Sequence, residues 1–276
     1  MLDQNLSKIK YASQLAKKRG WRWVAVSAIG ELPYIPGLVG RLANSMCAQT
    51  PGFLVALAGV RANQLWADRK QVMERVAREF LTKPSNVLEV GTWMGKGSTQ
   101  VWIQLLPARS SLTVLDLWKQ YVASNEQIGA TARMDSMHHV AINSTLRSIY
   151  RAESEGRLAI SLIRADSKSF LPLLNDNSFD LIYLDGSHYY ADVKADLQQA
   201  KRLIRDGGLI CGDDLDLAPT PELIELARTR TDQDFVLLDD GRAFHPGVML
   251  ATVEELKSVQ CENASGGIAM IADCNH

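Results

Sequence analysis

The chain has 276 residues, of which 46% are hydrophobic and 22% are charged, and both fractions are ordinary for a globular protein. Thirty Lys and Arg residues against 31 Asp and Glu residues leave a formal net charge of −1 at pH 7, which excludes a broadly basic surface for nucleic acid. No apolar run reaches the roughly 18 residues that a membrane-spanning helix needs.

The four cysteines, at positions 47, 211, 261 and 274, contain no closely spaced pair of the kind that binds zinc or forms a redox motif. The first 20 residues are polar and lack the apolar stretch of a secretory signal. We therefore expect a soluble, cytoplasmic protein with reduced thiols, which has neither nucleic acid nor a membrane as its partner.

The region before residue 84 is helical in character. Apolar residues recur there mostly at helical spacing, as at Leu65, Val72 and Val76, and prolines divide the region into short helices. We predict an N-terminal helical extension over residues 1–83, which covers a binding site or forms a homodimer, and a second domain over residues 84–276.

After Pro84 the pattern changes to short apolar strands that alternate with helices. In chain order the sequence predicts a strand at 85–91, a helix at 98–106, a strand at 111–118, a long segment at 119–157 with a helix at 137–150, a strand at 158–166, a short helix at 167–174, a strand at 179–186, a helix at 191–204, a strand at 208–214, a helix at 221–229 and two further strands at 235–240 and 248–253. Such alternation is typical of a parallel sheet covered by helices on both faces. Ligands of these sheets bind at the carboxyl ends of the strands, so the residues at those ends are the candidates for function.

Five successive predicted strands each end in an acidic residue. These residues are Glu89, Asp116, Asp166, Asp185 and the pair Asp213 and Asp214. A single Asp after a strand has a plain explanation, because helix N-caps prefer Asp. Carboxylates that converge on one crevice repel one another unless cations or hydroxyl donors compensate. The acids therefore predict a site for a positively charged or hydroxyl-bearing ligand.

The first crossover, EVGTWMGKGS, contains Gly91, Gly95 and Gly97 ahead of a predicted helix. Glycines at these positions permit a tight turn and a close approach of a ligand to the backbone. Asp116 follows at the end of the next strand, where a carboxylate can accept both hydroxyls of a ribose. This pattern fits any cofactor that carries a nucleoside.

Three features favour a sulfonium cofactor over a nicotinamide dinucleotide. Glu89 stands at the end of the first strand, where it would repel a pyrophosphate and attract an amino group. The glycine spacing is also not the G-x-G-x-x-G of a dinucleotide fold. In addition, Asp166 in the segment RADS stands where an adenine amino group could donate a hydrogen bond to it.

Taken together, these motifs resemble the class I S-adenosylmethionine-dependent methyltransferases over roughly residues 84–252. EVGTWMGKGS is similar to the cofactor loop of that family, VLDLW to its acidic ribose motif and RADS to its adenine motif. The stretch 179–215 most resembles metal-dependent O-methyltransferases of the catechol and caffeoyl-CoA type and macrocin-type sugar methyltransferases. The resemblance implies an α/β, Rossmann-like, doubly wound and mostly parallel sheet of seven strands, with an antiparallel last strand and an N-terminal helical extension.

The resemblance also implies the roles of individual residues. The cofactor S-adenosylmethionine would be contacted by Glu89, Gly91, Thr92, Gly95, Gly97, Ser98, Asp116, Leu117, Asp166, Ser167 and Asp185. Asp185, Asp213 and Asp214 would hold a divalent cation, and three hard oxygen ligands suit Mg²⁺. His188 stands three residues after Asp185, where the catechol-type relatives carry a lysine base, so His188 and Asp185 are the predicted catalytic residues.

The sequence therefore predicts a metal-assisted O-methyltransferase whose partner is a small molecule with a hydroxyl acceptor, a sugar or a phenol. Two other classes remain open: a nicotinamide-dependent oxidoreductase, and a non-catalytic module in which residues 1–83 bind a partner. The roles assigned to individual residues also have simpler alternatives. The strand-end acids could cap helices or be solvated in a metal-free enzyme, His188 could be a hydrogen-bonded surface residue, and either His138 or His139 could contact the substrate.

Overall fold

The computed structural model describes residues 67–120, 134–256, 261–262 and 268–273, together with isolated positions before residue 66. Most of the predicted extension over 1–83 lies outside these residues, as does the middle of the segment 119–157. The boundary at residue 84 and the roles of the extension therefore stay predictions. Among the described residues, no helix is both long enough and apolar enough to cross a lipid bilayer.

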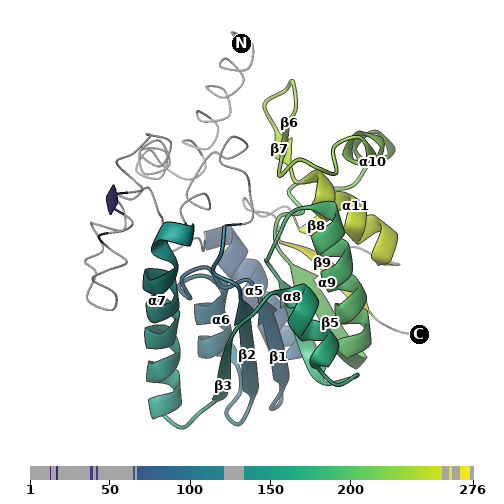
Figure 1. Ribbon diagram of the computed structural model, residues 1–276. Coiled ribbons are helices and arrows are strands. Elements are labelled where there is room, and N and C mark those ends of the chain that lie inside the picture. The colour runs from purple at the N-terminus through teal and green to yellow at the C-terminus, as the bar shows by residue number, and fades with distance from the viewer. Residues whose placement is uncertain are drawn as a thin grey trace.

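A seven-stranded sheet with the order β3–β2–β1–β4–β5–β9–β8 forms the centre of the fold (Figure 1). Its strands are β1 Asn86–Val90, β2 Ser111–Asp116, β3 Ala159–Arg164, β4 Phe179–Leu184, β5 Ile204–Gly212, β8 Cys261–Glu262 and β9 Ile268–Asp273. The first five strands pair in parallel, whereas β9 is antiparallel to β5 and β8 is antiparallel to β9. The predicted Rossmann-like, mostly parallel sheet with an antiparallel last strand is confirmed.

Helices cover both faces of this sheet (Figure 1). They are α5 Ala67–Phe80, α6 Ser98–Leu105, α7 Met134–Ser154, α8 Ser167–Phe170 with the 3₁₀ turn η3 Leu171–Leu173, α9 Tyr190–Leu203, α10 Pro221–Arg228 and α11 Pro246–Glu255. Helices α5, α6 and α7 share one hydrophobic cluster with the strands, and α9, α10 and α11 share the cluster on the opposite face. The fold is thus a three-layer α/β sandwich.

Side chains along the central strands alternate between these two layers, as the pleat of a strand requires. In β4, Leu181 and Tyr183 pack with α5, α6 and α7, whereas Ile182 and Leu184 pack with α9 and α11. The side chain of a residue just beyond a strand continues this alternation if the backbone stays extended. The alternation therefore decides which layer each strand-end acid faces.

The carboxyl ends of β1, β4 and β5 are aligned with one another. Val90 is paired with Leu184 across β1 and β4. The ladders continue one residue further, because the N–H of Asp185 donates to the carbonyl of Val90 at 2.7 Å and the N–H of Asp213 donates to the carbonyl of Leu184 at 3.1 Å. The strand order reverses between β1 and β4, which is where sheets of this type form their ligand crevice.

Of two strands predicted near the C-terminus, one is wrong and the other is shorter than expected. Residues 248–253 belong to helix α11, and their run of buried apolar residues could not be told from a buried strand by periodicity. The segment 235–240 contributes only the short β6, Val236–Leu237, which pairs with β7, Ala243–Phe244, outside the main sheet. The main sheet is completed instead by β8 and β9, which the sequence did not predict.

Gly91 is required by the close approach of the loop after β1 to the end of β4. Its φ angle is +84°, and a Cβ atom added to it would lie 1.7 Å from the carbonyl oxygen of Asp185. The close contact inferred from the sequence is therefore made, at this position, with the protein's own backbone.

We expect Gly91→Ala to lower the free energy of unfolding well beyond the roughly 1–2 kcal/mol that a left-handed backbone costs a non-glycine residue, because the methyl group also overlaps Asp185. Gly156→Ala is the matched control, since Gly156 has a φ angle of +64° with no atom within 4 Å of its added Cβ. Urea unfolding of both variants measures the difference. Equal losses in the two variants would show that the contact with Asp185 is not restrictive.

Candidate functional site

Glu89 is a fully buried carboxyl group next to the glycine loop. Its Oε1 accepts a hydrogen bond from Ser98 Oγ at 2.5 Å, at the start of α6, while its Oε2 is buried with no hydrogen-bond partner among the described residues. Burial raises the pKa of Glu89 to about 8, against the opposing effect of hydrogen bonds from Ser98 and Thr99. An unpartnered buried carboxyl oxygen at a ligand crevice indicates a missing donor.

Asp116, at the end of β2, accepts hydrogen bonds from the backbone of the glycine loop. Its Oδ2 accepts the backbone N–H groups of Thr92 at 2.8 Å and Trp93 at 3.0 Å, and its Oδ1 accepts the N–H of Trp118 at 2.7 Å. Burial raises the pKa of Asp116, although these three hydrogen bonds oppose the rise. Leu117 is exposed beside it. The contact of Asp116 with a ribose stays a prediction.

The other residues predicted to bind the cofactor lie around the same loop. The N–H of Gly95 donates to the carbonyl of Thr92 at 2.8 Å, and Gly97 precedes α6 as its N-cap. The hydroxyl groups of Thr92 and Thr99 contact each other. The loop is thus held internally by its own hydrogen bonds.

Asp166 lies further along the edge of the sheet and is exposed. It is the N-cap of α8, and its Oδ1 accepts the backbone N–H of Lys168 at 3.0 Å. Ser167 is the first residue of this short helix. Asp166 therefore caps a helix, which was one of the alternatives for the strand-end acids. Contact of Asp166 with an adenine stays a prediction.

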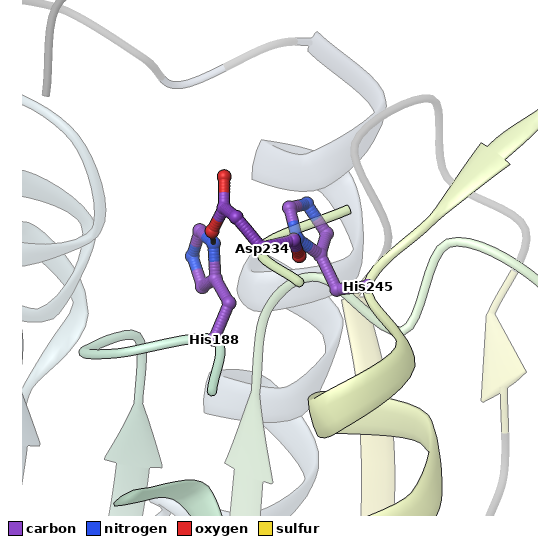
Figure 2. A group of neighbouring side chains, drawn as sticks. All are labelled: His188, Asp234 and His245. Atoms are coloured by element: carbon purple, nitrogen blue, oxygen red, sulfur yellow. Dashed lines mark hydrogen bonds and ion pairs between the residues drawn. The ribbon is translucent and has the colours of Figure 1, made fainter. Parts of the chain in front are cut away.

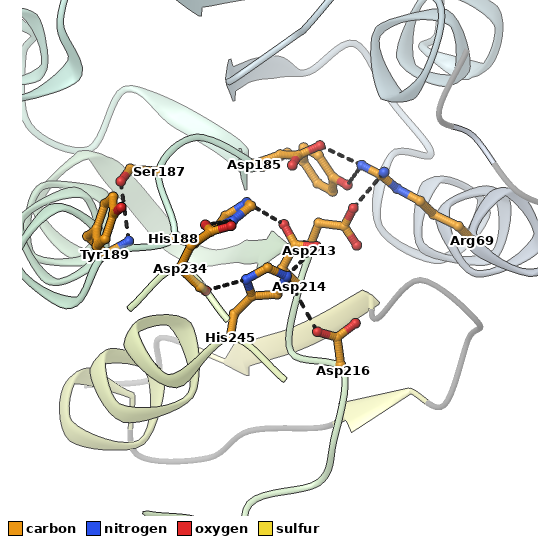
Figure 3. Close-up of polar contacts among 11 residues, drawn as sticks. Arg69, Asp185, Ser187, His188, Tyr189, Asp213, Asp214, Asp216, Asp234 and His245 are labelled. Carbon is orange, nitrogen blue, oxygen red and sulfur yellow. Dashed lines mark hydrogen bonds and ion pairs between the residues drawn. The ribbon is translucent and has the colours of Figure 1, made fainter. Parts of the chain in front are cut away.

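Arg69, on helix α5, is a site residue that was not predicted from the sequence. Its guanidinium contacts Asp185 Oδ2 at 2.5 Å, Asp213 Oδ2 at 2.5 Å and the hydroxyl of Tyr183 at 2.6 Å (Figure 3). The Arg69 side chain is only 5% exposed. Burial would lower the pKa of Arg69, but the surrounding groups, Asp213 first, raise it well above its usual value. The guanidinium is therefore a buried, permanent positive charge between the ends of β4 and β5.

A signal for Arg69 was present in the sequence. Arg69, Met73 and Val76 follow one another at helical spacing, and all three are buried in the structure. A charged residue in line with the apolar face of a helix needs a buried partner of opposite charge. The identity of that partner could not be read from the sequence, because Asp185 lies 116 residues away.

The carboxylates of Asp185, Asp213 and Asp214 each offer an oxygen atom within 4.8 Å of the others, as a shared cation would require. Arg69, however, already binds the first two, and a guanidinium in that position repels a divalent ion. The set does not fit Mg²⁺ while Arg69 is in place. Binding of Mg²⁺ by these three residues stays a prediction.

Asp214 faces away from Arg69 and belongs to a second group of charges (Figure 3). His188 Nε2 contacts its Oδ2 at 2.9 Å, and His188 Nδ1–H donates to Asp234 Oδ1 at 2.8 Å. Burial opposes protonation of His188, but the two carboxylates raise its pKa well above the usual value. Burial would raise the pKa of Asp214, but His188 and a second histidine, His245, lower it. Neither Asp234 nor His245 was predicted from the sequence.

The sheet order, the glycine loop after β1 and the acids at the ends of β1, β2, β4 and β5 define a class I methyltransferase fold. Residues 88–215 match the sequence model of a family described as a methyltransferase domain, from within β1 to just after β5. The resemblance to class I S-adenosylmethionine-dependent methyltransferases is thereby confirmed for this part of the chain.

Solved structures with a similar fold include a protein from Corynebacterium glutamicum, which is 14% identical with a TM-score of 0.50 and covers 85% of this chain and 91% of its own. The O-methyltransferase TomG from Streptomyces achromogenes, in complex with S-adenosylmethionine, is 18% identical with a TM-score of 0.49 over 83% of this chain and 89% of its own. An O-methyltransferase from Bacillus cereus, in complex with S-adenosylhomocysteine, is 17% identical with a TM-score of 0.48 and covers 80% of this chain and 87% of its own. No curated protein matches the sequence.

We expect Arg69→Met to lower the free energy of unfolding by about 3–5 kcal/mol, because it leaves Asp185 and Asp213 buried without a counter-charge. Arg78→Met, on the exposed face of the same helix, is the control and should change stability by no more than about 0.5 kcal/mol. Urea unfolding at pH 7 measures both. The triple variant Arg69→Met, Asp185→Asn, Asp213→Asn should recover part of the loss, and a triple variant as unstable as Arg69→Met would contradict the electrostatic explanation.

Glu89 should make stability depend on pH. Its pKa is about 8 in the folded protein and about 4.5 in the unfolded chain, so the folded state binds the proton more tightly and stability falls as pH rises from 4.5 to 8. We expect Glu89→Gln to remove this fall, which amounts to at most about 1.4 kcal/mol per pH unit. Chemical unfolding at a series of pH values measures it, with the exposed Glu153→Gln as control. Parallel profiles for the native chain and Glu89→Gln would show that Glu89 is ionised throughout.

Proposed function

We propose that this protein transfers the methyl group of S-adenosylmethionine to a hydroxyl group of a small molecule, a sugar or a phenolic compound. The observation that carries the proposal is Glu89, a buried carboxyl with an unpartnered oxygen, beside the glycine loop at the point where the strand order reverses. A cationic amino group in that crevice supplies the donor that Glu89 lacks. The methyltransferase-domain match over residues 88–215 supports the same reaction.

The cofactor side of the proposed site is the loop after β1 and the end of β2. Glu89 receives the amino group of the cofactor, and the loop from Gly91 to Gly97 surrounds it, with Thr92 and Ser98 at its two ends. Asp116 receives one ribose hydroxyl, since an ionised carboxylate has about four lone-pair directions and three are used by backbone N–H groups. Leu117, Asp166 and Ser167 line the adenine end of the proposed site.

The acceptor side is the loop after β4, which carries Asp185 and His188. Methyl transfer breaks the bond from sulfur to the methyl carbon, forms a bond from the acceptor oxygen to that carbon, and releases S-adenosylhomocysteine and the hydroxyl proton. Asp185 Oδ1 has no hydrogen-bond partner among the described residues, so it can bind the hydroxyl and take its proton. His188 was the base predicted from the sequence, but both of its ring nitrogens contact carboxylates, and we assign it the role of holding the loop in place.

Alignment of oxygen, methyl carbon and sulfur supplies much of the acceleration in such a displacement. Arg69 contributes by fixing Asp185 and Asp213, so the acceptor binds to a carboxylate whose position is already set. Assistance by Mg²⁺, predicted from the sequence, is not part of this proposal, because Arg69 supplies positive charge at the same carboxylates.

The two competing functions fit the same residues less well. A dinucleotide would bring its pyrophosphate to a loop that begins beside the buried Glu89, where the phosphate charge opposes ionisation of Glu89 and offers no donor to its Oε2. A non-catalytic module has no use for Glu89 Oε2, whose burial without a partner costs about 1–3 kcal/mol.

Calorimetric titration of the full chain with S-adenosylhomocysteine and with NAD⁺ separates these functions. We expect binding of S-adenosylhomocysteine only, weakened at least tenfold by Glu89→Ala and by Asp116→Asn through loss of their hydrogen bonds. Asp206→Asn, exposed at the amino end of β5, is the matched control and should bind normally. Binding of NAD⁺ in place of S-adenosylhomocysteine would overturn the proposal.

The same preparations test the reaction with radiolabelled S-adenosylmethionine and a panel of sugars and phenols. Metal-stripped protein should transfer the label at the same rate with and without added Mg²⁺. A rate that needs Mg²⁺ and is lost in Asp213→Asn would reinstate the metal site predicted from the sequence. Transfer only to amine or thiol acceptors would overturn the assignment of the hydroxyl.

A further inference from the structure

We propose that His188, His245, Asp214 and Asp216 form a binding site for one divalent transition-metal ion of the Zn²⁺, Mn²⁺ or Co²⁺ class. The ligands are the Nε2 atoms of both histidines and the carboxylate oxygens of both aspartates. This site lies on the far side of Asp214 from Arg69 (Figure 3), and it differs in position and in chemistry from the all-oxygen set of Asp185, Asp213 and Asp214.

Asp234 orients both imidazole rings. Its carboxylate accepts the Nδ1–H of His188 at 2.8 Å, and its backbone carbonyl accepts the Nδ1–H of His245 at 2.7 Å (Figure 2). A carbonyl oxygen can only accept, so Nδ1 of His245 carries a proton and Nε2 is left to bind a cation. Histidines that bind metals in proteins are held in this way, with the other ring nitrogen donating to a carboxylate or a carbonyl.

The distances around His245 Nε2 are those expected between neighbouring ligands of an ion. His245 Nε2 lies 3.8 Å from Asp214 Oδ1 and 3.7 Å from Asp216 Oδ2, which is too far for a hydrogen bond. Two ligands at about 2.1 Å from a common ion lie about 3–4 Å apart. His188 Nε2 is 2.9 Å from the same Asp214 carboxylate, and the ion would replace the proton now held between them.

The backbone is built to bring the two histidines together. His245 is the N-cap of α11, and His188 lies in the loop after β4. Gly247 lets these segments cross, because a Cβ atom added to it would lie 2.2 Å from the carbonyl oxygen of His188. The ring centroids of His188 and His245 are consequently 4.2 Å apart.

Charge also favours an ion at this place. The carboxylates of Asp214, Asp216 and Asp234 gather around the two imidazoles, while Arg69 is engaged with Asp185 and Asp213. The side chains of His188 and His245 are each 17% exposed, so the site is shielded yet open to entry of an ion. Imidazole nitrogen with carboxylate oxygen suits transition metals, whereas Mg²⁺ prefers oxygen alone.

Titration of metal-stripped full-length protein with Co²⁺ tests the site without any need for turnover. We expect one equivalent to bind with a visible absorption band of nitrogen- and oxygen-ligated Co²⁺, and we expect Zn²⁺ to displace it. His245→Gln and Asp216→Asn should each weaken binding at least tenfold and change the band. His138→Gln, on α7, removes a histidine elsewhere and should bind Co²⁺ as the native chain does.

Asp234 is a positioning residue in this proposal, so Asp234→Asn should shift the band and weaken binding about 10–100-fold. Each variant is first shown to be folded by its thermal unfolding transition. Absence of stoichiometric Co²⁺ binding, or binding that survives His245→Gln and Asp216→Asn but is lost in Asp185→Asn, would overturn the site. Failure of this test leaves the binding of S-adenosylhomocysteine unaffected, so the metal site and the proposed function fail separately.

Discussion

The ion pairs of one buried guanidinium, that of Arg69, allow the acidic ends of β4 and β5 to lie side by side. Two buried carboxylates at that separation repel each other and each loses its hydration, so neither would stay ionised without a counter-charge. Arg69 supplies it with short contacts to both Asp185 and Asp213, and the hydroxyl of Tyr183 accepts a further hydrogen bond. Helix α5 is therefore part of the site as well as part of the layer that covers the sheet.

The alternation of the strands then divides the acids between two environments. Tyr183 and Asp185 along β4, like Cys211 and Asp213 along β5, point toward α5, where the charge is balanced by an arginine. Asp214 is one residue further, with a φ angle of +67°, and turns toward the histidines next to α11. Neighbouring aspartates in the sequence thus have different partners, and the pair cannot be treated as one ligand unit.

The parts of this arrangement that the sequence could predict are the local ones. The apolar strands, the acids that follow them and the glycine loop are set by residues close together in the chain, and periodicity reveals them. The partners of those acids are not local. Arg69 and Asp185 are 116 residues apart in the sequence, and His188 and Asp234 are 46 residues apart. Each pair is therefore brought together only by the packing of the folded chain. Residues 248–253 of helix α11 were predicted as a strand because this mostly buried run shows no polar face.

The crevice between β1 and β4 therefore contains two kinds of acid, and the difference has a consequence for ligand binding. Asp185 is already matched by Arg69, whereas Glu89 is in contact with the neutral hydroxyls of Ser98 and Thr99 and keeps its proton because burial raises its pKa to about 8. A cationic group that binds beside Glu89 stabilises the ionised form, so binding at neutral pH must be accompanied by release of a proton. A neutral ligand gains nothing from that exchange. The proton on Glu89 thus gives the crevice a preference for cations that the near-zero net charge of the whole chain does not reveal.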